Sequence, residues 1–85
     1  MKKLGPRYID RDFGRYLKNK RLKKKMTQKE VADPLGYTAQ YVHNWEQGKS
    51  SVPMNAIPTI AKLLNISINE IIIKLLQLYK KRLKK

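Results

Sequence analysis

Few side chains in this 85-residue sequence could take part in catalysis or metal binding. The chain contains six Asp and Glu residues, a single histidine, His43, and no cysteine. The absence of cysteine excludes disulfides, thiolate metal sites and cysteine nucleophiles, and a single histidine excludes a multi-histidine metal cluster. Because an acid, a base and a nucleophile cannot be assembled from these residues, we expect no enzyme, no metal and no cofactor.

Positive charge is the chemistry that the sequence offers in quantity. Twenty Lys and Arg residues give a formal net charge of +14 at pH 7. Such an excess indicates a polyanionic partner, either nucleic acid or an anionic membrane. Lysines crowd the segment 18–25. This run is either a solvated helix face or part of a field that faces DNA.

A membrane is not the partner that we expect. The most apolar stretch, Ile71 to Tyr79, is far shorter than the roughly 20 residues that a spanning helix needs. The start of the chain is basic but lacks the apolar run of a signal peptide. We therefore expect a soluble protein of the cytoplasm.

Helix-capping sequences predict where the positioning elements begin. Thr27 and Glu30 form a capping box, because the Thr27 hydroxyl can accept from the Glu30 amide and the Glu30 carboxylate can accept from the Thr27 amide. A helix is therefore predicted to start at Gln28. Ser67 and Glu70 form a second capping box, which predicts that a C-terminal helix opens there.

The segment between these two boxes predicts a short helix from Ala39 to Glu46. Thr38 can cap its start, and Gly48 lies just past its end, where a left-handed residue is favoured. Val42 and Trp45 are three residues apart and face inward, so the polar side chains between and around them lie mostly outward.

Two further helices complete an all-α domain, because no segment shows a strand pattern. Asp10 or Asp12 can cap the first, which is predicted to run to about residue 24. Asn55 can cap another, with Pro58 in its first turn, and Pro34 is predicted to end or kink the helix that starts at residue 28. The chain then divides into a basic arm at 1–9, a domain at 10–66, and a C-terminal helix with a basic tail at 67–85.

The C-terminal helix carries more apolar side chains than one small core can cover. Such a surplus indicates an interface, and symmetric dimers are the commonest oligomers. We expect a homodimer, with a different protein partner as the alternative. The residues predicted to form this interface are Ile68, Ile72, Ile73, Leu75, Leu76 and Tyr79.

An ordered set of short motifs runs through the middle of the chain. These are TQKEVA at 27–32, GYT at 36–38, Val42, WEQGK at 45–49 and Pro53, with Ile60-Ala61 and Leu64 after them. Together they make residues 13–71 resemble the helix-turn-helix domain of phage repressors and Cro proteins, the xenobiotic-response-element class of bacterial regulators. The resemblance implies a five-helix, repressor-like fold with an extended C-terminal helix.

The resemblance also implies a role for each matching residue. The helix 39–46 would lie in the major groove, where Gln40 and Asn44 could each pair with an adenine and His43 could donate to a guanine or a phosphate. Gln28 would meet a phosphate at the start of its helix, and the loop 47–51 would form a second phosphate clamp. The implied DNA-binding residues are Gln28, Thr38, Ala39, Gln40, Tyr41, His43, Asn44, Gln47, Lys49, Ser50 and Ser51.

Arg21 and Glu46 match a family pair that forms a salt bridge between the first and third helices. The sequence departs from the family pattern at Lys25, where a glycine often ends the first helix, so we expect a strained left-handed residue there. It departs again at Ala39, which cannot hydrogen-bond to a base.

The function that follows is a sequence-specific double-stranded DNA-binding regulator, most simply a repressor that occupies a promoter. As a homodimer it would bind an inverted-repeat operator with half-sites roughly 10 bp, or about 34 Å, apart. One alternative is an antitoxin-type protein that also captures a toxin. Another is a nucleoid-associated protein that binds DNA through charge alone.

Overall fold

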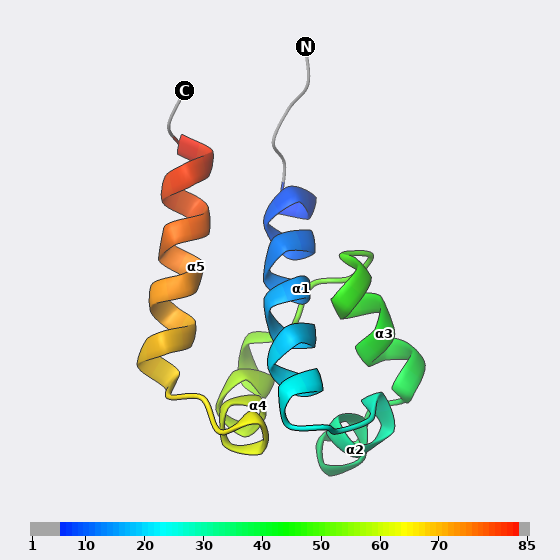
Figure 1. Ribbon diagram of the computed structural model, residues 1–85. Coiled ribbons are helices and arrows are strands. Elements are labelled where there is room, and N and C mark those ends of the chain that lie inside the picture. The colour runs from blue at the N-terminus through cyan, green and yellow to red at the C-terminus, as the bar shows by residue number, and fades with distance from the viewer. Residues whose placement is uncertain (1–5, 84–85) are drawn as a thin grey trace.

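The computed structural model describes residues 6–83, and all of the regular secondary structure in this part of the chain is helical (Figure 1). Five α-helices and one 3-10 turn follow each other along the sequence. They are α1 (Pro6–Lys23), α2 (Gln28–Leu35), α3 (Ala39–Gln47), η1 (Met54–Ala56), α4 (Ile57–Leu64) and α5 (Ile68–Leu83). The predicted all-α fold with five helices is therefore confirmed.

Helix α1 is the central element of the fold. It contacts α3 on one side and α5 on the other, and it runs antiparallel to α5 (Figure 1). The side chains between the helices form a single core with Trp45, Ile60, Ile71 and Val42 as its most completely buried large members. Because α2 packs on α3 and on α4, and α3 packs on α1, the core fixes the helix-turn-helix pair against the longest helix of its domain.

Helix α1 begins earlier than predicted. Asp10 and Asp12 do not cap it but lie inside it, because the helix already starts at Pro6. Proline is tolerated in the first helical turn, and Ile9 extends the apolar stripe of Phe13 by one turn, with only 3% of its surface exposed. Residues 6–9 of the expected basic arm are thus part of α1, and residues 1–5 lie outside the described chain.

The start of α2 and both ends of α3 agree with their capping sequences. At the start of α2 the Glu30 amide donates to Thr27 Oγ1 over 3.0 Å, and the Thr27 amide donates to Glu30 Oε1 over 2.8 Å. Thr38 caps α3 by accepting from the Tyr41 amide, and Gly48 ends that helix with a φ of 78°. Pro34 falls in the last turn of α2, which ends one residue later.

Two glycines allow α3 to pack unusually close to α1. A Cβ atom on Gly14 would lie 1.9 Å from the Trp45 carbonyl oxygen, and one on Gly48 would lie 2.6 Å from Arg11 Cα. Both neighbours are backbone atoms, which cannot move aside as a flexible side chain can. Sequence analysis missed Gly14, although a glycine within the apolar stripe of a predicted helix signals a close approach of backbones.

Helix α4 starts differently from the prediction. Asn55 is not its cap, because residues 54–56 form a 3-10 turn that leads directly into the helix, whose N-cap, Ala56, has no side-chain hydrogen bond. Pro58 lies in the first turn, as predicted. Lys25, with a φ of 58°, adopts the predicted left-handed conformation after α1.

Helix α5 docks on α1 through two buried side chains and one polar cluster. Ile71 and Leu78 are buried in the core. Glu70 was predicted to complete a capping box with Ser67, but only half of the box forms: the Glu70 amide donates to Ser67 Oγ. The Glu70 carboxylate turns instead toward α1, where it accepts from Tyr16 Oη over 2.6 Å and pairs with Lys20 Nζ at 2.9 Å.

This cluster shifts two pKa values in opposite directions. Burial, followed by the hydrogen bond to Glu70 and its charge, raises the pKa of Tyr16. The hydrogen bond from Tyr16, followed by that from Lys20, lowers the pKa of Glu70. A carboxyl with a lowered folded-state pKa stabilises the fold above its unfolded pKa of about 4.3, and this contribution is lost as the pH falls through the folded value.

We predict that Gly14→Ala destabilises the protein although alanine is the better helix former. The added methyl collides with the Trp45 carbonyl, and such overpacking costs about 1–3 kcal/mol or more, against a gain of up to about 1 kcal/mol in helix propensity. Gly36→Ala is the matched control, because Gly36 has a positive φ but open space around it. Urea unfolding followed by circular dichroism should show the larger loss for Gly14→Ala. An equal or smaller loss contradicts the close crossing.

We also predict that Tyr16→Phe raises the pKa of Glu70 toward its ordinary value, because it removes the hydrogen bond that lowers this pKa most. An NMR titration of the side-chain carboxyl carbons measures the change. Tyr37→Phe is the control, since the Tyr37 ring packs against Tyr41 and Trp45 instead. A Glu70 pKa that is the same in both variants would show that Tyr16 does not hold the carboxylate.

Candidate nucleic-acid interface

One side of α3 presents a row of polar side chains. Successive residues of a helix are rotated by about 100°, so side chains three, four and seven positions apart share a face. Val42, Trp45 and Glu46 point into the protein. The residues on the opposite side are Ala39, Gln40, His43, Asn44 and Gln47.

Gln40 and Asn44 lie together on this face, as their spacing predicts. Gln40 Nε2 donates to Asn44 Oδ1 over 3.1 Å. This contact leaves the Gln40 oxygen and the Asn44 amino group free to bond elsewhere, since each amide carries one acceptor and two donor hydrogens. The pair therefore offers both a donor and an acceptor to a ligand that lies along the helix.

A buried ion pair holds the inward side of α3. Arg21 from α1 donates to Glu46 through Nε, 2.6 Å from Oε2, and through Nη2, 3.0 Å from Oε1. Its third nitrogen, Nη1, donates to the Met26 carbonyl over 2.7 Å. Arg21 and Glu46 are only 8% and 6% exposed. The predicted pair is confirmed, and its two-point geometry fixes both the position and the rotation of α3 relative to α1.

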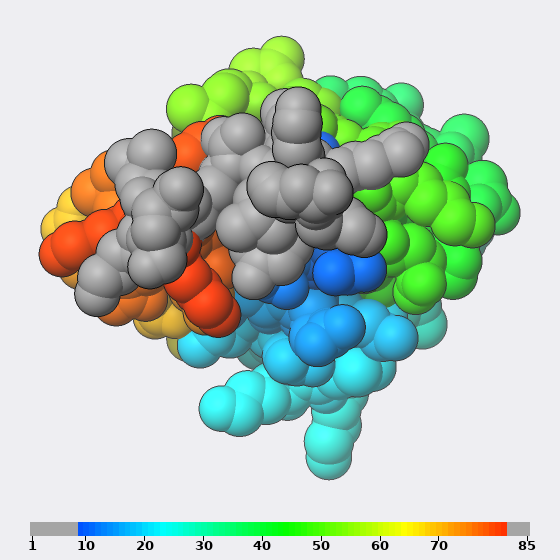
Figure 2. All heavy atoms as spheres, turned by 90° about the horizontal axis from the view of Figure 1, so that it is seen from above, coloured from blue at the N-terminus to red at the C-terminus, as the bar shows by residue number. Residues whose placement is uncertain are grey.

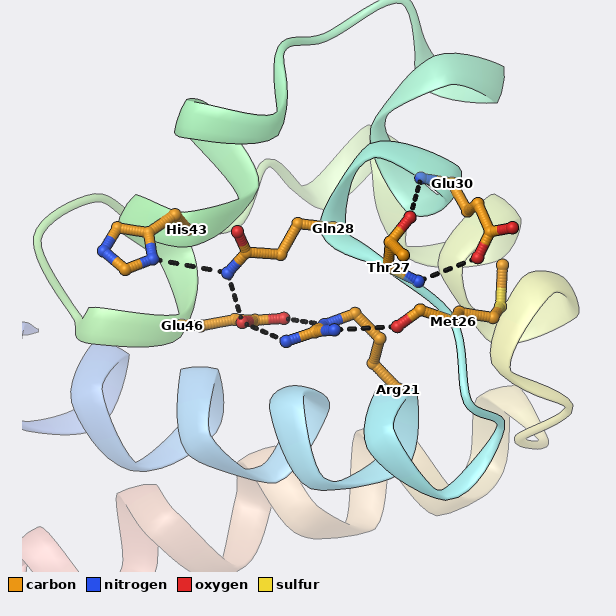
Figure 3. A network of polar contacts seen from close by, with 7 residues as sticks. All are labelled: Arg21, Met26, Thr27, Gln28, Glu30, His43 and Glu46. Atoms are coloured by element: carbon orange, nitrogen blue, oxygen red, sulfur yellow. Dashed lines mark hydrogen bonds and ion pairs between the residues drawn. The ribbon is translucent and has the colours of Figure 1, made fainter.

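The same carboxylate also organises the start of α2. Gln28 Nε2 donates to Glu46 Oε1 over 2.9 Å and lies 3.3 Å from His43 Nδ1 (Figure 3). The Gln28 side chain therefore points toward α3, where it links the ion pair to the polar face. Sequence analysis placed Gln28 against a phosphate and missed this link, which no local pattern signals.

The loop after α3 is closed by backbone hydrogen bonds. The amides of Lys49 and Ser50 both donate to the Asn44 carbonyl, over 2.9 and 3.3 Å, and the Lys49 side chain is exposed. Ser51 was expected to offer a free hydroxyl donor, but its Oγ donates to Asp10 Oδ2 over 2.7 Å. Of the expected phosphate clamp, Lys49 thus extends into solvent, whereas the Ser51 hydroxyl holds the loop against α1.

Two other predicted contact residues are engaged within the protein. The Thr38 hydroxyl accepts from the Tyr41 amide as the N-cap of α3. The Tyr41 ring is half-buried and packs edge-on against Tyr37 and Trp45, with ring centroids 5.0 and 5.3 Å away. Trp45 is a core residue, as expected.

The lysine run after residue 18 does not form one face. Lys20 pairs with Glu70 on the α5 side of α1, whereas Lys23, Lys24 and Lys25 are exposed where α1 leads into α2. In Figure 2 side chains at this end of α1, in cyan, project from the body of the molecule, while α5, in orange and red, forms the opposite flank from the green segment of α3. The charge of Lys23 also contributes to the lowered pKa of Glu70, so Lys23 as well as Lys20 lies toward α5.

The described residues form neither a metal-binding cluster nor a helix that could span a membrane. Within residues 6–83 no group of three or more acidic or histidine side chains could hold a metal ion. None of the helices described is both long enough and apolar enough to cross a membrane.

Comparison with known proteins identifies the family. A sequence model of the family described as Helix-turn-helix matches residues 17–71, more than half of the chain. The match includes α2, α3 and α4 in full, together with the second part of α1 and the start of α5. No curated protein and no solved structure matches the chain significantly. With the buried Arg21–Glu46 pair and the polar face of α3 in the matched region, the chain belongs to the Cro/C1-type helix-turn-helix family of DNA-binding transcriptional regulators.

Proposed function

We propose that this protein is a sequence-specific repressor that reads the major groove of double-stranded DNA with α3. The observation that carries the proposal is the polar face of α3, whose opposite side is held by the buried Arg21–Glu46 pair. A helix fits the major groove, which is about 12 Å wide and presents a different pattern of donors and acceptors for each base pair. A face that is held rigidly can discriminate between such patterns.

Gln40 and Asn44 are the side chains that we assign to base contacts. A carboxamide donates and accepts at once, which matches the N6 and N7 atoms of adenine. Their mutual hydrogen bond orients both amides before DNA arrives, so less side-chain freedom is lost on binding.

We assign the phosphate contacts to the two ends of the motif. The free amides at the start of α2 favour an anion, and Lys49 offers an exposed charge after α3. These groups fix the register of the protein on DNA without reading its sequence. The net charge of +14 adds a long-range attraction to the duplex.

We further propose that the active species is a homodimer formed through the outer face of α5. Five apolar side chains on this face are 45–62% exposed, and they are Ile68, Ile72, Ile73, Leu76 and Tyr79. Leu75, which was predicted to join them, instead packs in part against the protein's own core. Since α5 and α3 lie on opposite sides of α1 (Figure 1), the dimer contact leaves the DNA-reading face open.

Selection of bound duplexes from a random pool at about 150 mM salt tests the proposed function. We predict enrichment of an inverted repeat with half-site centres about 10 bp apart. For Gln40→Ala we predict that the preference relaxes at one base pair of each half-site, because a bidentate amide–adenine pair is worth about 1–3 kcal/mol. The matched control is Gln77→Ala on α5. Binding without any enriched sequence would instead support a charge-driven nucleoid protein.

Leu76→Asp tests the dimer, because Leu76, at 62%, is the most exposed apolar residue among those of α5 whose side chains the structure describes. We predict that the wild-type protein sediments at twice its chain mass of 10.0 kDa, and that the variant sediments as a monomer. Met54→Asp adds the same charge at another exposed apolar residue, which lies outside α5 in η1, and should leave the dimer intact. A monomeric wild-type protein that copurifies with a second polypeptide would instead support the antitoxin-type function.

A further inference from the structure

The hydrogen-bonding role of His43 follows from a series of contacts that links Arg21, Glu46 and Gln28 to its ring. Glu46 has an ionised carboxylate, which can only accept hydrogen bonds. Arg21 donates to both of its oxygens. Oε1 also lies 2.9 Å from the side-chain nitrogen of Gln28, so the amino group of Gln28, and not its oxygen, is directed at the carboxylate.

The orientation of Gln28 in turn determines where the His43 ring carries its hydrogen. Gln28 Nε2 lies 3.3 Å from His43 Nδ1. An amide nitrogen has two hydrogens and no available lone pair, so in this contact Gln28 is the donor and Nδ1 is the acceptor. Nδ1 therefore carries no hydrogen. In the neutral ring the single hydrogen must then be on Nε2, which makes that atom a donor.

The donor nitrogen faces away from the network. In Figure 3 the His43 ring turns one nitrogen toward Gln28 and the other to the opposite side, clear of the drawn side chains. His43 is half-buried and lies on the same face of α3 as Gln40 and Asn44, one turn from Ala39 and from Gln47. A fixed N–H donor therefore projects from the face to which we have assigned base recognition.

We propose that His43 is a specificity-determining residue that reads a guanine, with Gln28 as the residue that positions it. The inference rests on the proposed DNA-binding function and adds the base and the atom that reads it. Guanine presents two neighbouring acceptors, N7 and O6, in the major groove, which suit a donor on Nε2. The amino groups of adenine and cytosine at the same place would meet this donor with a donor of their own. One hydrogen bond of this kind gives about a 2- to 10-fold preference.

The tautomer can be measured in the free protein. Long-range 1H–15N correlation spectra at about pH 8 show which ring nitrogen is protonated, and the assignment is immediate because the sequence contains one histidine. We expect the hydrogen on Nε2 and a hydrogen-bonded shift at Nδ1. In Gln28→Met, which keeps the length of the side chain but has no N–H, the Nδ1 shift should move to that of an unbonded ring. A hydrogen on Nδ1 in the wild-type protein overturns the inference.

Selection from a random DNA pool tests the guanine contact with two replacements of His43. Asparagine places its oxygen near the position of Nδ1 but has no atom at that of Nε2, whereas glutamine can place an N–H there. We expect His43→Asn to lose a guanine preference that the wild-type protein shows, and His43→Gln to retain it. Circular dichroism should show that both variants fold, since His43 is only half-buried.

The possible failures are distinguishable. If the wild-type protein and His43→Asn select the same operator equally, the guanine contact is overturned and the proposed function stands. His43 would then contact only phosphate. A wild-type protein that selects no sequence overturns both the proposed function and the guanine contact, while the NMR result on the tautomer stands by itself.

Discussion

The buried Arg21–Glu46 pair is the interaction on which the geometry of the motif depends. Two charges with less than a tenth of their surface exposed lose most of their hydration, and only good geometry with further hydrogen bonds compensates for that loss. Here Arg21 uses three nitrogens and Glu46 accepts from Arg21 and Gln28. Because these partners come from α1, from the turn after it and from α2, one carboxylate on α3 ties together all parts of the helix-turn-helix.

Close backbone packing makes this arrangement rigid. Gly14 and Gly48 bring α3 against α1 at two points, so the helix has little room to rotate or slide. The capping bonds at Thr27 and Thr38 fix where α2 and α3 begin, and therefore which side chains fall on the outer face. The polar network and the packing thus constrain the same orientation of α3, which is what recognition of base edges requires.

Local sequence chemistry predicted the parts of the fold that depend on neighbouring residues. The caps at Thr27 and Thr38 and the turn at Gly48 follow from contacts only a few residues apart, and the structure confirms them. Two helix starts were predicted wrongly, because α1 already begins at Pro6 and a 3-10 turn precedes α4. Other errors concern side chains that could choose a distant partner: Ser51 bonds to Asp10, and Glu70 bonds to Tyr16. Such choices depend on which helices pack together, and neither periodicity nor capping rules contain that information. The Arg21–Glu46 pair, whose residues are 25 positions apart, was predicted only through the family resemblance.

The central claim is that the ion pair acts by orienting α3 and not merely by stabilising it. Replacing only Arg21 leaves a buried charge and should cost about 3–5 kcal/mol, whereas the apolar double replacement Arg21→Met/Glu46→Leu can restore stability. The decisive measurement is the operator affinity of this double variant, beside its free energy of unfolding. We predict near wild-type stability with operator binding weakened at least about 10-fold, because Gln28 and α3 lose the group that orients them. Wild-type affinity in a stable double variant would contradict the claim.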